Sequence, residues 1–250
     1  MDVKKTIIIF ILIVIILIIA YARISGSCKL NKQYPCSKDF CLLKIFKLDV
    51  HNKLKNQILE KVLYNKEIVK RVEINMYPET IGQCALPNKR GGTVATDKII
   101  KYLPSVIDFY ENTLCEFISN KLNLKLYTTS MDLPTTCALL VYEKEGDWIN
   151  WHYDYNYYKG RFFTVLIPIT NSLTCTKFQF INSENNIEDI DLTENNCIVF
   201  EGNYLYHRAS KLCENQKRII LSCQFVTDPN MSFINKFRLK LKDFAYTGKL

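Results

Sequence analysis

The spacing of apolar residues divides the chain into three parts. Residues 6–22 form an uncharged run rich in isoleucine. In residues 42–63 the apolar positions recur at helical spacing, and residues 96–124 repeat that pattern with a break at Pro104. From Thr136 onward the period changes to short runs of β-branched and aromatic residues, separated by turn signals. The pattern therefore predicts an apolar N-terminal segment, a helical layer and a β-rich core.

Five apolar runs in the C-terminal half have the length and composition of strands, at residues 137–143, 162–170, 177–182, 197–202 and 218–226. Helices followed by many short strands indicate a mainly β fold with helical cover. A double-stranded β-helix, or jelly roll, fits this count of strands, and a plain β-sandwich is the alternative. We expect a helical lead-in and loop over residues 39–135, packing on a β core with a basic C-terminal segment over residues 136–250.

Two parts of the lead-in are expected to lie at the surface. Residues 77–93 contain proline, asparagine and a Gly-Gly pair, which predict a loop. Lys89 and Arg90 in this loop are expected to face solvent rather than to contact a substrate. His51 has no acidic residue two positions later, and we interpret it as a residue on the surface of a helix.

Residues 1–22 are predicted to anchor the chain in a membrane. The uncharged run over residues 6–22 is at the short end of the length that a spanning helix needs. Ala20 and Ala22 also form a pattern that a signal peptidase could cleave, so a removed signal peptide is the alternative. Residues 23–38 would be a stalk. Basic residues flank the run on both sides, so the distribution of positive charge gives no orientation.

The composition describes one domain with an appendage and a basic surface. The chain has 250 residues and a formal net charge of +8, with one basic cluster at residues 236–242. A solvated helix face or the lysines of an edge strand explains this cluster better than an anionic partner such as a membrane surface. A nucleic-acid partner fits poorly with a chain that a membrane tethers.

The ten cysteines bear on the compartment. No Cys-x-x-Cys pair occurs, which argues against a zinc ribbon. Cys28, Cys36 and Cys41 follow the apolar run closely and could be bridged in an oxidising lumen. Together with the glycosylation sequon at residues 230–232, they favour a single-pass membrane protein whose domain is lumenal or extracellular. The other cysteines include Cys137, Cys197 and Cys223, which occupy apolar runs and are expected to be small buried hydrophobes.

Two of the three histidines could share one site with an aspartate. His152 and Asp154 are two residues apart, so on a strand their side chains face the same side. His207 comes from a distant run and could complete a three-point face. Two imidazoles and one carboxylate on one side of a metal form the facial triad of non-haem Fe(II) oxygenases. The His-x-Asp pattern alone is weak evidence, so its flanks matter.

Arg218 opens the last apolar run, where a guanidinium inside a barrel requires an anionic partner. Neighbouring residues on a strand face opposite ways, so Lys217 and Arg218 cannot both point inward. We choose Arg218, because Ile220 and Ser222 share its face. Tyr142 stands ten residues before His152.

These motifs give the chain a family resemblance. Residues 137–226, with "VYEKEGDWINWHYD", "GRFFTVLIPIT", "CIVFEGNYLYHRA" and "KRIILSCQF", resemble the double-stranded β-helix core of the Fe(II)/2-oxoglutarate-dependent oxygenases, and their prolyl 4-hydroxylase-like branch in particular. The resemblance implies that His152, Asp154 and His207 are iron ligands. It implies that Arg218 pairs with the distal carboxylate of 2-oxoglutarate, and that Tyr142 hydrogen-bonds the same cosubstrate. The helices before Thr136 match the helical layer that supports the major sheet.

The resemblance leaves the substrate open, because two features are absent. Many relatives have a tyrosine on the strand near Pro168 and a Gly-Gly pair before the fifth strand, and this chain has neither. The aromatic residues near the proposed ligands are expected to be packing and rim, and they are the first places to seek substrate contacts: Trp148, Trp151, Tyr153, Tyr155, Tyr157 and Tyr158.

The expected activity is hydroxylation of an unidentified substrate, with release of succinate and CO2. A prolyl or lysyl residue in a protein, or a small molecule, would be that substrate. The alternative is a non-catalytic, membrane-anchored β-barrel that binds a partner or serves as a structural protein of a virion envelope.

Overall fold

The computed structural model describes residues 7–14, 16, 42–75, 87–171 and 175–239. Within these ranges no helix is both long enough and apolar enough to cross a membrane. Residues 1–6, 15 and 17–22 of the predicted anchor lie outside the described residues, as do the stalk at 23–38 and the Cys28, Cys36 and Cys41 cluster. The predictions of an anchor, of a cleaved signal and of bridges within this cluster therefore stay predictions.

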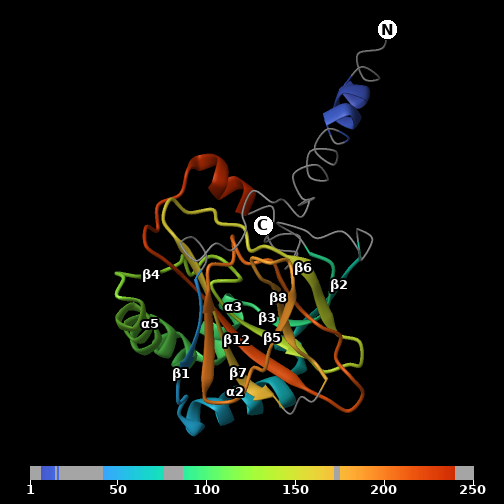
Figure 1. The fold of residues 1–250 in the computed structure, drawn as a ribbon. Coiled ribbons are helices and arrows are strands. Elements are labelled where there is room, and N and C mark those ends of the chain that lie inside the picture. Colours follow the sequence, from blue (N-terminus) through green and yellow to red (C-terminus); the bar gives the residue numbers. More distant parts are fainter. Residues whose placement is uncertain (1–6, 15, 17–41, 76–86, 172–174, 240–250) are drawn as a thin grey trace.

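One curled antiparallel sheet forms the core (Figure 1). Its strands follow the spatial order β1 (Leu43–Lys47), β10 (Asn196–Phe200), β7 (Phe162–Asn171), β12 (Arg218–Val226), β5 (Cys137–Tyr142), β3 (Lys89–Val94), β6 (Trp148–His152), β11 (His207–Ala209), β8 (Phe178–Ile181) and β9 (Ile187–Ile190). Two further strands pair at the side of this path, β2 (Lys70–Ile74) with β3 and β4 (Tyr127–Thr128) with β12. The predicted class, mainly β with helical cover, is confirmed, and the curl is consistent with a jelly roll.

Helices cover the outer face of the sheet (Figure 1). They are α2 (Asn52–Tyr64), a short turn at Lys66–Ile68, α3 (Thr96–Tyr102), α4 (Pro104–Asp108), a π-helical turn at Phe109–Leu114, and α5 (Cys115–Leu122). His51 caps α2, since its imidazole accepts a hydrogen bond from the backbone N–H of Lys53, and its side chain is exposed as expected. Pro104 begins α4, where its missing N–H costs nothing. Asn123 ends α5 in the left-handed conformation.

Two of the three apolar clusters of the described residues lie on opposite faces of the sheet. The larger core lies between the helices and the outward side chains of β5, β7, β10 and β12, and includes Ile99, Val106, Phe163 and Leu221. The smaller core lies inside the curl and includes Leu166, Phe178, Phe200 and Ile220. Alternation along the strands sends neighbouring residues to different cores. The inner core is incomplete on one side, and that side holds the polar residues of the site.

Two predicted elements are wrong. The predicted helix over residues 42–63 begins only at Asn52, because Leu43–Lys47 forms β1 and pairs with β10. The predicted loop at residues 77–93 ends in strand β3, which runs between β5 and β6. The glycines that suggested a loop allow close strand packing instead: a Cβ at Gly92 would overlap the Val69 side chain. Both strands join the same sheet as the C-terminal half.

The cysteines of the described residues behave in two ways. Cys137, Cys197 and Cys223 are buried free thiols in the outer core, as expected for small hydrophobes. Cys175 and Cys213 form a disulfide that was not predicted, and it encloses the stretch of chain that contains β8 to β11.

The described part of the basic C-terminal segment is helical. Residues 233–239 form a helix, which excludes the edge strand as an explanation for these residues. Leu239 packs against Tyr157 and Phe162. The remaining basic residues, Lys240 and Lys242, lie outside the described ranges.

Candidate metal centre

Two histidines face each other across adjacent strands. His152 ends β6 and His207 begins β11, and the two residues are register partners in the antiparallel pair. Cross-strand partners hold their side chains on the same face, and the two imidazole centroids are 4.2 Å apart. The backbone ladder therefore sets the spacing of these rings.

Asp154 completes the cluster from the chain just beyond β6. The ligand atoms of His152, Asp154 and His207 all lie within 4.8 Å of one another, close enough to hold one metal ion. The His152 Nε2 atom is 3.7 Å from Asp154 Oδ1. The predicted residues are thus brought together from two distant parts of the sequence.

The second nitrogen of each imidazole is fixed by the backbone. His152 Nδ1 is 2.7 Å from the carbonyl oxygen of Asn150, and His207 Nδ1 is 2.8 Å from that of Leu205. A carbonyl oxygen only accepts, so Nδ1 carries the proton in both rings. The lone pair of Nε2 is then available to a metal, which is the usual arrangement of ligating histidines.

The Asp154 carboxylate is oriented by two residues that the sequence reading missed. The Thr164 hydroxyl donates a hydrogen bond of 2.6 Å to Asp154 Oδ2, and the Asp154 backbone N–H donates to the Gly202 carbonyl at 2.9 Å. A Cβ at Gly202 would overlap the Asp154 carboxyl group, so only glycine leaves room for it. Neither role has a local signal, because each contact joins segments that are far apart in the sequence.

The electrostatics favour the neutral form of the His207 imidazole. Burial lowers the pKa of His207, while the Asp154 carboxylate and the hydrogen bond to the Leu205 carbonyl oppose that shift. A neutral imidazole is the ligand form. Two nitrogen ligands and one carboxylate on one side suit a non-haem iron or a similar divalent ion, with the opposite side open to other ligands.

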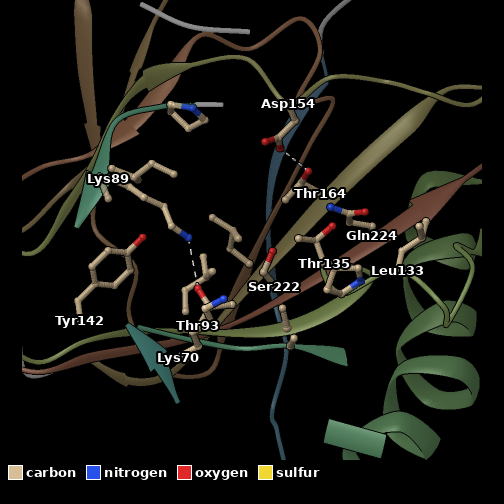
Figure 2. Close-up of a pocket in the computed structure, with 18 of the residues that line it drawn as sticks. Lys70, Lys89, Thr93, Leu133, Thr135, Tyr142, Asp154, Thr164, Ser222 and Gln224 are labelled. Atoms are coloured by element: carbon tan, nitrogen blue, oxygen red, sulfur yellow. Dashed lines mark hydrogen bonds between the residues drawn. The ribbon is translucent and has the colours of Figure 1, made fainter. Parts of the chain in front are cut away.

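The three residues line a large cavity inside the curled sheet. Its volume is about 1050 Å³, and its wall includes Arg218, Tyr142 and Ser222 as well as the triad. Figure 2 shows Asp154 and Thr164 toward one end of this space, with Tyr142 and Ser222 farther along it. The volume lies at the upper end of the range of small-molecule sites.

Arg218 points into this cavity as predicted, and Lys217 on the opposite face of the strand is exposed. Arg218 is only 3% exposed, and its Nε and Nη1 atoms have no hydrogen-bond partner among the described residues. Burial lowers its pKa, which measures the cost of holding this charge away from water. The arrangement calls for an anion that accepts two parallel hydrogen bonds.

Tyr142 is the cross-strand partner of Arg218. The Arg218 Cζ atom lies 5.4 Å from the centre of the Tyr142 ring. Burial raises the pKa of the Tyr142 hydroxyl, and the nearby guanidinium opposes that shift, so the phenol stays protonated at neutral pH. A protonated phenol is able to donate a hydrogen bond into the cavity.

Lys89 is the main residue that sequence reasoning misplaced. It lies on β3, is 6% exposed and lines the cavity, where its Nζ donates to the Thr93 hydroxyl at 3.3 Å (Figure 2). Arg90, its neighbour, faces the other way and lies 3.5 Å from the buried Asp147 carboxylate. The proline and glycines around Lys89 concealed the strand.

The aromatic residues near the triad mainly pack against one another. Trp151 and Tyr153 both pack on Tyr206, with ring centroids 5.3 and 4.9 Å away respectively. Tyr157 and Tyr158 are buried beside Phe162. Among the six aromatic residues singled out in the sequence, Tyr153 lines the cavity and is the one placed to contact a substrate.

Comparison with known proteins gives likeness in structure only. No protein-family model matches the chain, and no curated protein matches it either. The non-heme alpha ketoglutarate dependent epimerase SnoN of nogalamycin biosynthesis is similar over 74% of this chain and 76% of its own, at 9% identity and a TM-score of 0.53. AviO1 from Streptomyces viridochromogenes Tue57 is similar over 76% of this chain and 91% of its own, also at 9% identity and 0.53.

Two further solved structures are similar to this chain. A Pseudomonas putida prolyl-4-hydroxylase matches 75% of this chain and 93% of its own at 13% identity, with a TM-score of 0.48. Another structure of SnoN, in complex with Fe3+, alpha ketoglutarate and nogalamycin RO, matches 74% of this chain and 78% of its own at 11% identity, with a TM-score of 0.53. The chain thus has the fold of an alpha ketoglutarate dependent enzyme, and the resemblance read from the sequence is confirmed at the level of the fold.

Proposed function

We propose that this chain is an Fe(II)- and 2-oxoglutarate-dependent oxygenase that hydroxylates a substrate and releases succinate and CO2. His152, Asp154 and His207 would hold the iron, and Arg218 would bind the distal carboxylate of 2-oxoglutarate. The observation that carries the proposal is the buried Arg218 guanidinium in the same cavity as the His-Asp-His cluster, with two nitrogens that find no partner in the part of the chain that the structure describes. A 2-oxo acid with a second carboxylate would account for both features, because one end would bind the metal and the distal carboxylate would pair with Arg218.

The residues present fit this iron. Three ligands hold a divalent ion in one geometry, and the open side leaves positions for a bidentate 2-oxo acid and for oxygen. Bound iron would supply the activation of oxygen that drives decarboxylation of the cosubstrate and hydroxylation of the substrate. The likeness to SnoN, whose structure holds Fe3+ and alpha ketoglutarate, supports the choice of metal and cosubstrate.

The chain's own residues fix the protons of the two imidazoles, orient the Asp154 carboxylate and keep water away from His207. The Asn150 and Leu205 carbonyls hold the imidazole protons on Nδ1, and Thr164 turns the Asp154 carboxylate so that Oδ1 faces the histidines. The Phe178 and Phe200 rings pack on His207, with centroids at 5.4 and 4.8 Å. This apolar wall keeps water from the imidazole and strengthens every electrostatic contact in the cavity.

The compartment and the substrate are parts of the same proposal. A lumenal or extracellular domain is supported by the Cys175–Cys213 disulfide, because disulfides persist in oxidising compartments, and the uncharged run at residues 6–22 would anchor the chain in a membrane. A prolyl or lysyl residue on a secretory protein, or a small molecule, would suit such an enzyme. The opposing reading, a non-catalytic binding module, gives no reason for a buried guanidinium beside an intact triad.

The experiment uses the full chain, purified in detergent without oxygen. The wild type should bind one Fe(II) and, once oxygen is admitted, convert 2-oxoglutarate to succinate. His152→Ala, Asp154→Ala and His207→Ala should each lose iron and succinate production, while the melting temperature stays close to that of the wild type. His51→Ala removes the exposed third histidine and is the matched control, with no expected effect on Fe(II) binding or on succinate production. A wild type that takes up no Fe(II), or an Asp154→Ala variant with undiminished turnover, would overturn the proposal.

A further inference from the structure

The outward face of the helix at residues 233–239, called the C-terminal helix below, is apolar. Phe233 is 87% exposed, Ile234 62% and Phe237 59%. Elsewhere in residues 42–75, 87–171 and 175–232 the exposed large apolar side chains come one or two at a time from separate elements: Ile45, Leu63, Tyr64, Ile100, Tyr127 and Ile187. A contiguous exposed patch such as that on the C-terminal helix is typical of an interaction surface.

The opposite face of the C-terminal helix is attached to the body of the protein. The Asn235 side-chain amide donates a hydrogen bond to the Tyr157 carbonyl oxygen at 2.9 Å, and Leu239 is buried against Tyr157 and Phe162. Asn235 and Leu239 are four residues apart, so they lie on the same side of the helix. These contacts fix how the helix is rotated, and its three exposed apolar side chains are turned away from the protein.

Two cations lie at the edges of the apolar face. An α-helix turns by about 100° per residue, which places Lys236 on one edge and Arg238 on the other, between the attached side and the outward side. The long apolar stems of these residues can lie along the apolar face while their charged ends reach beyond it. A helix face that only water covers would carry its charges outward, so this arrangement argues against the solvated face suggested by the sequence.

The charge of this region complements an anionic surface. Between Asp228 and Asp243 the sequence has no acidic residue and four cations: Lys236, Arg238, Lys240 and Lys242. An apolar helix face bordered by cations is typical of segments that lie in the headgroup region of an anionic membrane. Each lysine or arginine close to such a surface adds to the attraction.

We propose that the C-terminal helix docks on an anionic membrane surface, with its exposed apolar side chains among the lipid headgroups and Lys236 and Arg238 against their negative charges. This contact differs from the predicted anchor at residues 6–22, because the helix would lie on the membrane rather than cross it. The inference does not depend on the oxygenase activity.

The docked helix would lie close to the cavity. Leu133 lines the cavity and packs against the same apolar cluster as Leu239. Tyr157, whose carbonyl oxygen binds the helix, follows the candidate metal ligand Asp154 by only a few residues. Docking would therefore hold the cavity near the lipid surface, where a substrate carried by the membrane would be within reach.

The test measures lipid contact at single positions of the full chain, reconstituted in nanodiscs of phosphatidylcholine with or without phosphatidylserine. Phe237 is replaced by the photo-crosslinking residue p-benzoylphenylalanine. The control carries the same residue in place of Tyr64, which is 85% exposed on α2, at the opposite end of the molecule from the C-terminal helix (Figure 1). With phosphatidylserine present, mass spectrometry should find lipid adducts about tenfold or more as often at position 237 as at position 64.

Two double variants, made in the chain that crosslinks at position 237, separate the apolar and the ionic contributions. Phe233→Ser with Ile234→Ser should lower the yield of lipid adducts about fivefold or more, because two apolar side chains no longer leave water. Lys236→Gln with Arg238→Gln should abolish the increase in yield that phosphatidylserine produces.

A matched pair of substitutions controls for net charge. Lys66→Gln with Lys217→Gln removes the same charge from exposed positions on other elements and should leave the yield at position 237 within about twofold. The melting temperature of each variant is measured as well. If a variant fails to fold, the comparison of positions 237 and 64 in the two lipid mixtures still decides the question.

The remaining outcomes also decide the question. A chain that does not associate with the nanodiscs, or lipid adducts that are no more frequent at position 237 than at position 64, would overturn the proposal. Adducts with a second copy of the chain in place of lipid would assign the apolar face to self-association. A yield that neither the serine nor the glutamine double variant changes would mean that the anchor alone brings the helix to the bilayer, and would also reject docking.

Discussion

The two faces of strand β12 have opposite characters. The outward residues pack under the helices and are each no more than 2% exposed: Ile219, Leu221, Cys223 and Phe225. The inward residues include three polar side chains that line the cavity: Arg218, Ser222 and Gln224. A single nine-residue strand thus serves the folded core with one set of residues and the site with the other.

This difference teaches that stability and function are carried by alternate residues. The outward side chains find their partners within the protein, so they contribute to folding directly. Arg218 on the inward face has buried nitrogens without a partner within the described ranges, which costs stability until a ligand binds. Substitutions on the two faces should therefore change different measured quantities.

The largest effect is expected from the outward face. Phe225→Ala removes a fully buried ring that packs 5.0 Å from the ring of Tyr110, and should lower the free energy of unfolding by about 3–5 kcal/mol. Gln224→Ala, one residue away on the inward face, should change it by about 0.5 kcal/mol or less. Denaturant unfolding followed by circular dichroism measures both. Equal losses for the two variants would show that the faces are not separate in energy.

The next largest effect is expected from the inward face, where a substitution should weaken ligand binding and leave stability intact. Arg218→Met should weaken binding of 2-oxoglutarate by about 2–5 kcal/mol, because one partner of a buried charge-assisted pair is deleted. The same change removes a buried charge that has unpaired nitrogens, so the free energy of unfolding should stay equal or rise. Titration of the iron-loaded protein and thermal melting test the two statements, with Lys217→Met as the control. A fall in stability without loss of binding would contradict the assignment.

A neighbouring pair on β7 sharpens the comparison further. Thr164→Val deletes the hydroxyl that orients Asp154 and should weaken Fe(II) binding about 10–100-fold. Val165→Thr places a hydroxyl in the dry outer core and should cost about 1–3 kcal/mol of stability without changing the affinity for iron. Anaerobic Fe(II) titration and chemical unfolding separate the two results. Weaker iron binding by Val165→Thr would mean that the outer core controls the site.

The smallest effect concerns how stability depends on pH, through Tyr110, which lies next to Phe225 in the outer core. Burial raises the pKa of Tyr110 well above its ordinary value, and its hydroxyl donates to the Gln224 carbonyl at 2.5 Å. The unfolded chain loses this proton near pH 10 while the folded chain retains it. Tyr110 should therefore contribute stability that is complete below pH 10 and is lost at about 1.4 kcal/mol per pH unit above it. Tyr110→Phe should lose less stability than the wild type between pH 10 and 11, and parallel curves would contradict the shift.

The sequence predicted the parts of the site that depend on local alternation. His152 and Asp154 share a face because they are two residues apart, and the inward phase of Arg218 follows from its neighbours in the same run. These features need only one strand to be read correctly. The curled, helix-covered sheet was also predictable, because long apolar runs and turn signals marked most of its strands.

The missed features depend on contacts between distant segments. Nothing near Lys89 indicates a strand, since its pairing with β5 and β6 is decided by the curl of the whole sheet. Leu43–Lys47 is too short for its periodicity to distinguish helix from strand. Thr164 acts on Asp154 from strand β7 and Gly202 acts on it from the turn after β10, while the Cys175–Cys213 bridge joins positions 38 residues apart.

The register of β6 and β11 has a consequence for how a metal would enter. Because His152 and His207 are partners in the ladder, their spacing is already fixed when the sheet folds. Bringing metal ligands together usually costs conformational entropy. Here that cost is incurred when the protein folds rather than when the metal binds. Asp154 lies beyond the strand, but Thr164 and the Gly202 carbonyl already hold its carboxylate and its backbone N–H. Iron uptake should then be fast and reversible, with a backbone that is the same before and after the ion arrives.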